Sequence, residues 1–189
     1  MCRVLLASGS LKGRDFFTHL ITEYGIREVL SAQTGKDTRD ALSKTDIDLL
    51  IINAPLADEF GDLLAGYASR NSCCGIVMVV KSDTDERIVL GAENAGAFTV
   101  RTPLSKALFR QTFRLARATR NRMLGIESEN KRLSRRLEDM GLVDRAKCTL
   151  IQVLGMTEPQ AHRYIEKQAM DMRVSKRQVA EELLKTYEV

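Results

Sequence analysis

Five short apolar runs, each followed by a stretch of helix-forming residues, restrict the fold of the first 113 residues more than any other feature. The apolar runs are Arg3–Ala7, Glu28–Ser31, Asp48–Asn53, Gly75–Val80 and Ala97–Arg101. The helical stretches are Gly13–Tyr24, Thr34–Lys44, Glu59–Arg70, Asp85–Ala95 and Ser105–Arg120. Buried strands that alternate with helices form a parallel sheet that is covered on both faces. We therefore predict an α/β domain over residues 1–113, built on a doubly wound five-stranded parallel sheet with its ligand site at the C-terminal ends of the strands.

Residues 114–141 contain no proline and are rich in helix formers, so we predict a linker helix there. Apolar residues and one asparagine recur in it at alternating spacings of three and four: Met123, Ile126, Asn130, Leu133, Leu137 and Met140. This spacing is typical of a coiled-coil seam, and leucine at d with one asparagine at a favours a parallel homodimer. The alternative is a single long helix whose apolar side chains face the core of the same chain. Gly125 in mid-helix argues against the coiled coil.

Residues 142–189 have the pattern of three short helices joined by two tight turns. We expect Gly155 to end the first helix in a left-handed conformation, and Thr157 with Pro159 to begin the second. Ser175 is the expected N-cap of the third. The apolar positions at helical spacing are Ala146, Leu150, Val153, Leu154, Ala161, Ile165, Ala169, Val179, Leu183 and Leu184. A unit this small buries little apolar surface, so we expect it to lean on a partner or a second copy.

Positive charge is concentrated in the C-terminal part of the chain. Residues 1–113 carry 13 Lys and Arg against 14 Asp and Glu, whereas residues 114–189 carry 16 against 11. The basic positions predicted to be exposed in the last segment are Lys147, Arg163, Lys167, Arg173, Lys176 and Arg177. A further cluster in the linker comprises Lys131, Arg132, Arg135 and Arg136. Such a field attracts a polyanion, but solvated helices are often basic too, so charge alone assigns no partner.

Four separated motifs in the C-terminal segment occur in the order of a known family. They are Ala146-Lys147, Thr157-Glu158 with Ala161, Gln168-Ala169-Met170-Asp171 and Val179-Ala180. Over roughly residues 138 to 189 the chain resembles the ANTAR domain, the RNA-binding module of the AmiR and NasR antitermination regulators. His162 stands where the family commonly has an aromatic residue. The resemblance implies a homodimer that binds two hairpins of a leader mRNA and thereby prevents terminator formation.

Recognition of RNA loops needs cations for the phosphates and polar groups for unpaired bases. We predict an RNA-binding set made of Lys147, Arg163, Lys167, Gln168, Arg173, Lys176 and Arg177. His162 and Tyr164 are further candidates for reading or stacking on bases. Four alanines are expected to permit close helix packing instead: Ala146, Ala161, Ala169 and Ala180.

The strand ends of the N-terminal domain resemble those of a second family. DLLIINAPL ends the predicted third strand at Asn53, and ENAGAFTVRTPLS ends the fifth at Thr102-Pro103. This layout is similar to the flavodoxin-like (CheY-like) receiver domain of bacterial response regulators. Active receivers carry an acidic pair that holds magnesium, a phosphoacceptor aspartate, a hydroxyl residue and a lysine. The matching positions here are Ala7, Ser8, Asn53, Val80 and Thr102.

These replacements remove the chemistry of phosphoryl transfer. The amide of Asn53 is not a nucleophile that forms an acyl phosphate, and no carboxylate remains at the matched positions to hold a divalent cation. Without the lysine, no fixed cation meets the phosphate oxygens. We therefore predict a pseudo-receiver that is controlled by something other than aspartyl phosphorylation.

Two short segments near the strand ends invite stronger interpretations. Asp58 and Glu59 could form a displaced phosphoacceptor or metal site, but we favour a solvated turn that caps the following helix. The GSLKG stretch at residues 9–13 is rich in small residues but lacks phosphate-loop spacing, so we expect it to be an ordinary first turn.

The remaining observations indicate a regulator rather than an enzyme. We find no catalytic dyad and no metal-ligand spacing, and we expect reduced thiols in a cytoplasmic protein at Cys2, Cys73, Cys74 and Cys148. No apolar run approaches the ~20 residues that cross a bilayer, and the N-terminus lacks a signal-peptide layout. We thus expect no cofactor, no metal and no membrane partner.

Two other functions stay open at this point. Three short helices after a receiver-like domain also fit a DNA-binding regulator of the helix-turn-helix type. A signalling adaptor is the second alternative, in which the pseudo-receiver only binds a sensor protein. A small-molecule regulator of the pseudo-receiver is left open as well.

Overall fold

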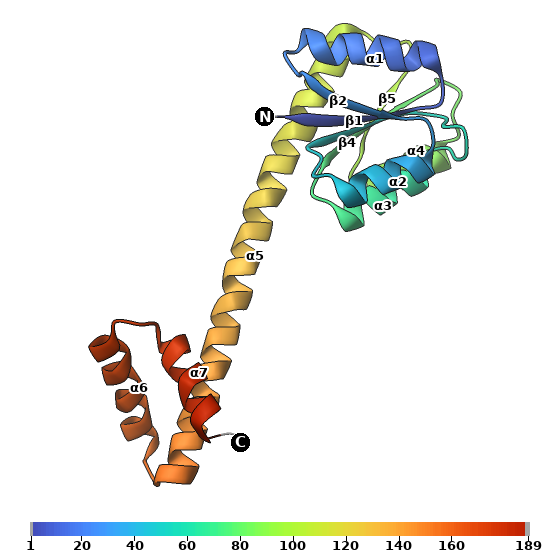
Figure 1. Cartoon of the computed structure of the whole chain (residues 1–189). Coiled ribbons are helices and arrows are strands. Elements are labelled where there is room, and N and C mark those ends of the chain that lie inside the picture. Colours follow the sequence, from blue (N-terminus) through green and yellow to red (C-terminus); the bar gives the residue numbers. More distant parts are fainter. Residues whose placement is uncertain (1, 188–189) are drawn as a thin grey trace. The chain divides into compact units, whose positions relative to one another are not determined.

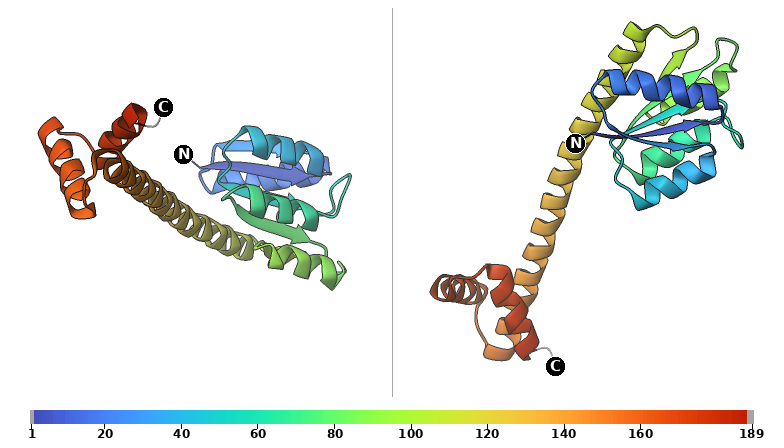
Figure 2. Two further views of the ribbon diagram at one scale, coloured as in Figure 1. Left: turned by 90° about the horizontal axis from the view of Figure 1, so that it is seen from below. Right: turned by 45° about the horizontal axis from the view of Figure 1, so that its top comes forward.

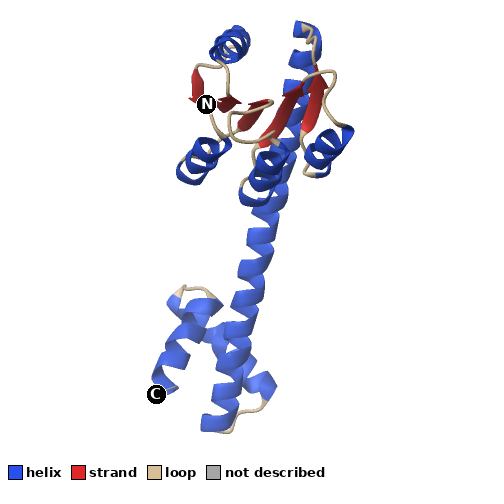
Figure 3. Ribbon diagram, turned by 90° about the vertical axis from the view of Figure 1, so that its right-hand side faces the viewer, coloured by secondary structure: helices blue, strands red, loops and turns tan. Residues whose placement is uncertain are grey.

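The computed structural model describes residues 2–187 and contains two compact units, Met1–Gly125 and Ile126–Val189. Strands occur in the first unit, and the described part of the second is helical (Figure 3). Within the described residues, no helix is both long enough and apolar enough to cross a membrane.

The first unit is built on a five-stranded parallel sheet. The strands are β1 (Arg3–Ser8), β2 (Glu28–Ala32), β3 (Leu49–Asn53), β4 (Gly75–Val80) and β5 (Phe98–Arg101). Their order is β2-β1-β3-β4-β5, and every neighbouring pair is parallel. The predicted doubly wound sheet is therefore confirmed, with each strand bound within one residue of the expected range.

Helices cover both faces of this sheet (Figure 1). The helix α1 (Leu11–Glu23) and the beginning of α5 pack on one face, where Phe17, Phe109 and Phe113 lie in one buried cluster. The other face is covered by α2 (Gly35–Lys44), α3 (Asp62–Asn71) and α4 (Glu86–Asn94). Because successive strand residues point to opposite faces, a continuous apolar strand such as β3 supplies both clusters.

Two helix starts differ from the predicted ones by more than one residue, and local contacts explain both. The helix α1 begins at Leu11 rather than Gly13, because the Ser10 hydroxyl accepts a hydrogen bond from the Gly13 N–H at 3.1 Å. The helix α3 begins at Asp62 rather than Glu59, after Gly61 at φ 110°. A Cβ on Gly61 would lie 2.7 Å from Cγ2 of the Ile52 side chain, so this close approach also requires glycine.

The helix α5 (Lys106–Leu154) is continuous over 49 residues. It contains the stretches that we predicted as the last receiver helix, the linker helix and the first C-terminal helix. Phe109, Phe113 and Ala116 are buried against the sheet. Further along, the Arg120 guanidinium pairs with the Asp48 carboxylate at 2.5 Å, and both side chains are largely buried. This ion pair holds α5 against the edge where β3 begins.

The second unit packs α6 (Glu158–Met172) and α7 (Lys176–Tyr187) with the last part of α5 (Figure 2). Its core comprises Ala146, Leu150, Ala161, Ile165, Ala169, Val179, Ala180 and Leu184. The four alanines predicted to permit close packing are all buried. Val153 and Leu154 continue the apolar spacing but are about half-exposed, because the buried part of α5 ends at Leu150 and only Ile151 packs against the core beyond it.

The predicted helix ends of this unit are confirmed. Gly155 follows the last residue of α5 at φ 63°. Thr157 precedes α6, and its N–H donates to Oε1 of Gln160 at 2.8 Å. Ser175 precedes α7, and its hydroxyl accepts from the Gln178 N–H at 3.2 Å.

Candidate functional site

Lys147, which we predicted to be an exposed cation, is instead held in internal ion pairs. Only 17% of its side chain is exposed, and its Nζ lies 2.8 Å from Oδ1 of Asp144 and 3.1 Å from Oε1 of Glu158. Hydrogen bonds to these two carboxylates raise the pKa of Lys147. Glu158 begins α6, so the lysine joins the first turn of α6 to α5. The sequence did not reveal the contact with Glu158, because that partner lies across the Gly155 turn.

Two further predicted cations, Lys176 and Arg177, also have carboxylate partners. The Lys176 Nζ lies 2.5 Å from Oε1 of Glu166, and this contact lowers the pKa of Glu166. Arg177 pairs with Glu181 and Asp139 at 2.8 Å each, and these hydrogen bonds raise the pKa of Arg177. Lys147, Lys176 and Arg177 therefore form a paired set, whose positive charge is partly neutralised within the unit.

The other three predicted cations form an open set: Arg163, Lys167 and Arg173. All three are exposed, and within residues 2–187 the structure records no ion pair or side-chain hydrogen bond for any of them. Arg163 and Lys167 are four residues apart on α6, so their side chains are neighbours on the helix surface. Arg173 follows α6 in the left-handed conformation, at φ 54°. The open set thus offers guanidinium and ammonium groups that no carboxylate of the described residues pairs with.

The residues predicted to contact bases lie in mixed surroundings. Gln168 and Tyr164 are half-buried, and Tyr164 packs against the core of the second unit. His162 is exposed, with its Nε2 3.3 Å from Oε1 of Glu166. Sequence reasoning missed Met170, which is 78% exposed and lies one turn beyond Lys167 on α6. Met170 follows Lys167 by three residues and Arg163 by seven, and this helical spacing indicated that the three share one face of α6.

A groove in the second unit gathers part of the predicted set. It has a volume of about 610 Å³ and is lined by Arg136, Asp139, Met140, Val143, Asp144, Lys147, His162, Ser175, Lys176 and Arg177. The paired set lies in this lining, whereas the open set and Gln168 do not. The seven predicted residues are therefore divided between a groove of mixed charge and the outer side of α6.

The predicted dimer seam is unpartnered in the single chain. Its apolar side chains are between 39% and 69% exposed: Met123, Ile126, Leu133, Leu137 and Met140. Asn130 is exposed as well. The coiled-coil seam and its alternative, a stripe that faces a core of the same chain, both stay predictions.

Four of the five receiver positions meet at one edge of the sheet. Ser8 and Asn53 are paired in register, and the Asn53 amide nitrogen donates to the Ser8 hydroxyl at 2.9 Å. Asn53, Val80 and Thr102 line a cavity of about 460 Å³. Its only charged lining residue is Lys81, and Ala7 is buried one residue before Ser8. The edge holds an amide and hydroxyl groups where a divalent cation would need carboxylates.

The interpretation of Asp58 as part of a solvated turn is confirmed, since it is exposed, but neither Asp58 nor Glu59 caps the following helix. The Asp58 carboxylate accepts from the N–H groups of Gly35 and Lys36 at 2.7 and 3.2 Å, and these bonds lower its pKa. It therefore caps α2. Glu59 forms a two-fold hydrogen bond with the Arg39 guanidinium at 2.6 and 2.8 Å. The described residues contain no cluster of three side chains that suits a metal ion.

Comparison with known proteins agrees with this two-part structure. The family model of the ANTAR domain matches residues 131–184. The transcriptional regulatory protein PdtaR from two strains of Mycobacterium tuberculosis is 32% identical over 187 residues, which cover 97% of this chain and 90% of PdtaR.

Solved structures match the first unit. A two-component response regulator from Clostridium difficile has a TM-score of 0.54 at 19% identity, over 65% of this chain and 98% of that one. The receiver domain of an HD-domain protein from Pseudomonas fluorescens has a TM-score of 0.59 at 16% identity, over 66% and 92%. These likenesses establish the receiver fold. With the match to PdtaR along nearly its whole length, the chain belongs to the family of transcriptional regulators, not enzymes, that join a receiver domain to an ANTAR domain.

Proposed function

We propose that this protein is an RNA-binding transcription antiterminator. Its dimer binds a leader mRNA that carries two hairpins, and the bound hairpins withhold the sequence that would otherwise form the terminator. The observation that carries this proposal is the open set on the ANTAR segment, because unneutralised cations on an exposed helix are suited to RNA phosphates. Met170, exposed beside them, adds an apolar contact for an unstacked base.

The dimer part of the proposal rests on the exposed seam of α5. Five apolar side chains at coiled-coil spacing are left in water by the single chain, and Asn130 lies at the one polar a position. Two chains joined along this seam carry two RNA-binding modules. A dimer then holds the second hairpin at a high effective concentration once the first is bound.

In this proposal the first unit, called the receiver unit from here on, is regulated without aspartyl phosphorylation; the second unit is called the ANTAR unit. The Asn53 amide occupies the phosphoacceptor position and is hydrogen-bonded to Ser8. Incubation with acetyl phosphate and magnesium should therefore leave the intact mass unchanged, with an active receiver domain as the positive control. A gain of about 80 Da that hydroxylamine removes would contradict this part of the proposal.

Titration of the purified protein with three nucleic acids tests the main function. The three are a two-hairpin leader RNA, a single hairpin, and duplex DNA with the same number of phosphates. We expect the two-hairpin RNA to bind most tightly at moderate salt, and the protein to increase read-through on a template that encodes it. A preference for duplex DNA would replace this proposal with the helix-turn-helix alternative, and equal weak binding to all three would favour the adaptor.

A further inference from the structure

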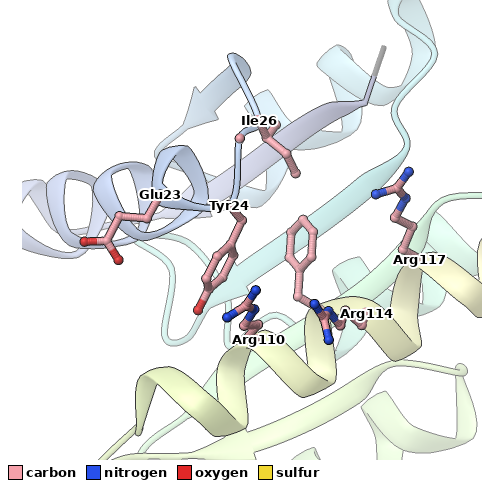
Figure 4. Close-up of a pocket in the computed structure, with 8 residues that line it drawn as sticks. Glu23, Tyr24, Ile26, Arg110, Arg114 and Arg117 are labelled. Carbon is pink, nitrogen blue, oxygen red and sulfur yellow. The ribbon is translucent and has the colours of Figure 1, made fainter.

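A pocket with a basic rim lies in the receiver unit, at the edge of the sheet opposite Asn53. It has a volume of about 630 Å³, and its walls come from the end of α1 with the turn after it and from one side of α5 (Figure 4). Its lining residues are Glu23, Tyr24, Gly25, Ile26, Arg110, Phe113, Arg114 and Arg117. The volume is within the range of about 300–1,000 Å³ that is usual for small-molecule sites.

Three arginines of α5 give the pocket an unbalanced positive charge. Arg110, Arg114 and Arg117 follow one another at spacings of four and three, so they share one face over about 10 Å of helix. All three are exposed, and the structure records no carboxylate partner for them within residues 2–187.

The pocket's one carboxylate does not neutralise them. The Glu23 oxygens accept from Lys106 Nζ at 3.1 Å each. Arg39, Arg101 and Arg120 of the same unit each pair with a carboxylate, whereas this trio lines one pocket without such a partner among the described residues. Like charges four residues apart weaken a helix, and a bound anion would relieve that repulsion.

The floor and one wall of the pocket are apolar. Phe113 and Ile26 are buried residues whose edges reach the lining. The Tyr24 ring forms the wall toward α1, where the Arg110 guanidinium lies 5.7 Å from its centre. The Tyr24 hydroxyl already donates to the Lys106 carbonyl oxygen at 3.0 Å, which holds the ring in place. Burial raises the pKa of Tyr24, so the phenol stays neutral.

We propose that this pocket binds a nucleoside phosphate. Guanidinium groups recognise phosphate oxygens through paired, charge-assisted hydrogen bonds, and three of them in a row suit a ligand with several phosphate oxygens. An apolar floor with an arginine and a tyrosine at its side suits a flat base. The pocket is closed on two sides by α1 and α5, which favours a small molecule over a nucleic-acid strand. Such a ligand gives the receiver unit an input at a site remote from Asn53.

Calorimetric titration of the full-length protein tests the proposal. The probes are ATP, ADP and AMP with their guanosine counterparts, plus pyrophosphate as an anion without a base and adenosine as a base without an anion. We expect at least one nucleoside phosphate to bind one site per chain, more tightly than either fragment. Arg114→Gln should weaken that binding about tenfold or more, because a charge-assisted pair is lost. Arg87→Gln, which removes an exposed arginine from α4, should change it less than about twofold.

Arg117→Gln provides a second variant in case Arg114→Gln perturbs folding, which circular dichroism would reveal. Absence of binding by every nucleoside phosphate overturns the proposal, as does binding that both variants leave unchanged. Pyrophosphate that binds as tightly as the nucleotides also overturns it, because the pocket would then recognise no base. If no nucleotide binds but both variants weaken binding of the leader RNA, the proposal is overturned and the three arginines belong to an RNA-binding surface.

Discussion

The two units of this chain differ in how completely a single copy buries its apolar residues. The receiver unit has a cluster on each face of its sheet, and these clusters contain most of the apolar residues of its strands. The ANTAR unit has one cluster of eight buried residues, half of them alanine. Beside it, α5 leaves a row of apolar side chains exposed. The first unit therefore buries most of its strand apolar residues by itself, whereas a row of apolar side chains beside the core of the second stays exposed.

The units also differ in their use of basic residues. In the receiver unit, ion pairs such as Arg39–Glu59 and Arg120–Asp48 join elements that are distant in the sequence. In the ANTAR unit the paired set does the same, but the open set on α6 has no internal role. Basic residues thus join elements in both units, and the open set is left without a carboxylate partner among the described residues.

The largest effect is expected from the seam. Leu133→Asp combined with Leu137→Asp places charges at an apolar interface, so the protein should become monomeric by light scattering. Affinity for the two-hairpin RNA should fall about 100-fold or more, because linked binding is lost, while affinity for one hairpin changes little. Glu138→Asp on the same stretch is the control. A dimeric double variant would show that the ANTAR unit is completed through another surface.

The next effect concerns the open and paired sets. Arg163→Ala with Lys167→Ala should lower affinity for the leader RNA about tenfold or more. The slope of log affinity against log salt concentration should become shallower by about one to two, since each phosphate contact contributes roughly one. Melting temperature should stay nearly unchanged. Lys176→Ala with Arg177→Ala removes the same charge from the paired set, and should weaken RNA binding less. The opposite ranking would place the RNA in the groove rather than along α6.

Lys147→Ala tests stability rather than binding. It leaves Asp144 and Glu158 without their shared cation, so the ANTAR unit should lose on the order of 1 kcal/mol of unfolding free energy. Thermal denaturation measures the loss, with Lys185→Ala on α7 as an exposed control. An unchanged melting point would mean that Lys147 is free to contact RNA, as the sequence alone suggested.

The smallest effect is expected at Arg173, where a substitution should raise the stability of the protein, whereas Lys147→Ala should lower it. A left-handed residue other than glycine costs about 1 kcal/mol, so Arg173→Gly should slightly raise the melting temperature. If the guanidinium contacts phosphate, the same change should weaken RNA binding. Arg173→Lys retains the charge and the strain, and should leave both quantities nearly unchanged. Binding that survives Arg173→Gly would remove this residue from the open set.

Most of the fold was predictable because its signals are local. The strands were found from apolar runs, and the caps at Ser175, Thr157 and Gly155 from residue types that suit those backbone conformations. The predicted end of the receiver helix at Arg120 was wrong: α5 continues to Leu154, because nothing in the sequence near Arg120 breaks a helix.

The candidate site was less predictable because it depends on contacts across turns. Exposure of Arg163 and Lys167 follows from the helical period of α6. By contrast, one of the two partners of Lys147 comes from α6, and one of the two partners of Arg177 comes from α5, 38 residues away. Asp58 was misjudged for the same reason, since it caps a helix that precedes it by more than 20 residues. A single sequence shows which residues are charged, but not which charges are already paired.

The continuous helix α5 implies very different amide exchange rates along one element. Near Phe113 and Ala116 its side chains are buried on the sheet, and near Ala146 and Leu150 they form the ANTAR core. Over residues 121–138 nearly every side chain is exposed, so a lone chain supports this stretch with backbone hydrogen bonds and a few exposed ion pairs, such as Lys131–Glu127 and Arg132–Glu129. Helices of that length are marginal in water, and such segments open far more often than the structure around them. Deuterium uptake in residues 121–138 should therefore slow as protein concentration rises, while uptake at both ends of the helix stays constant.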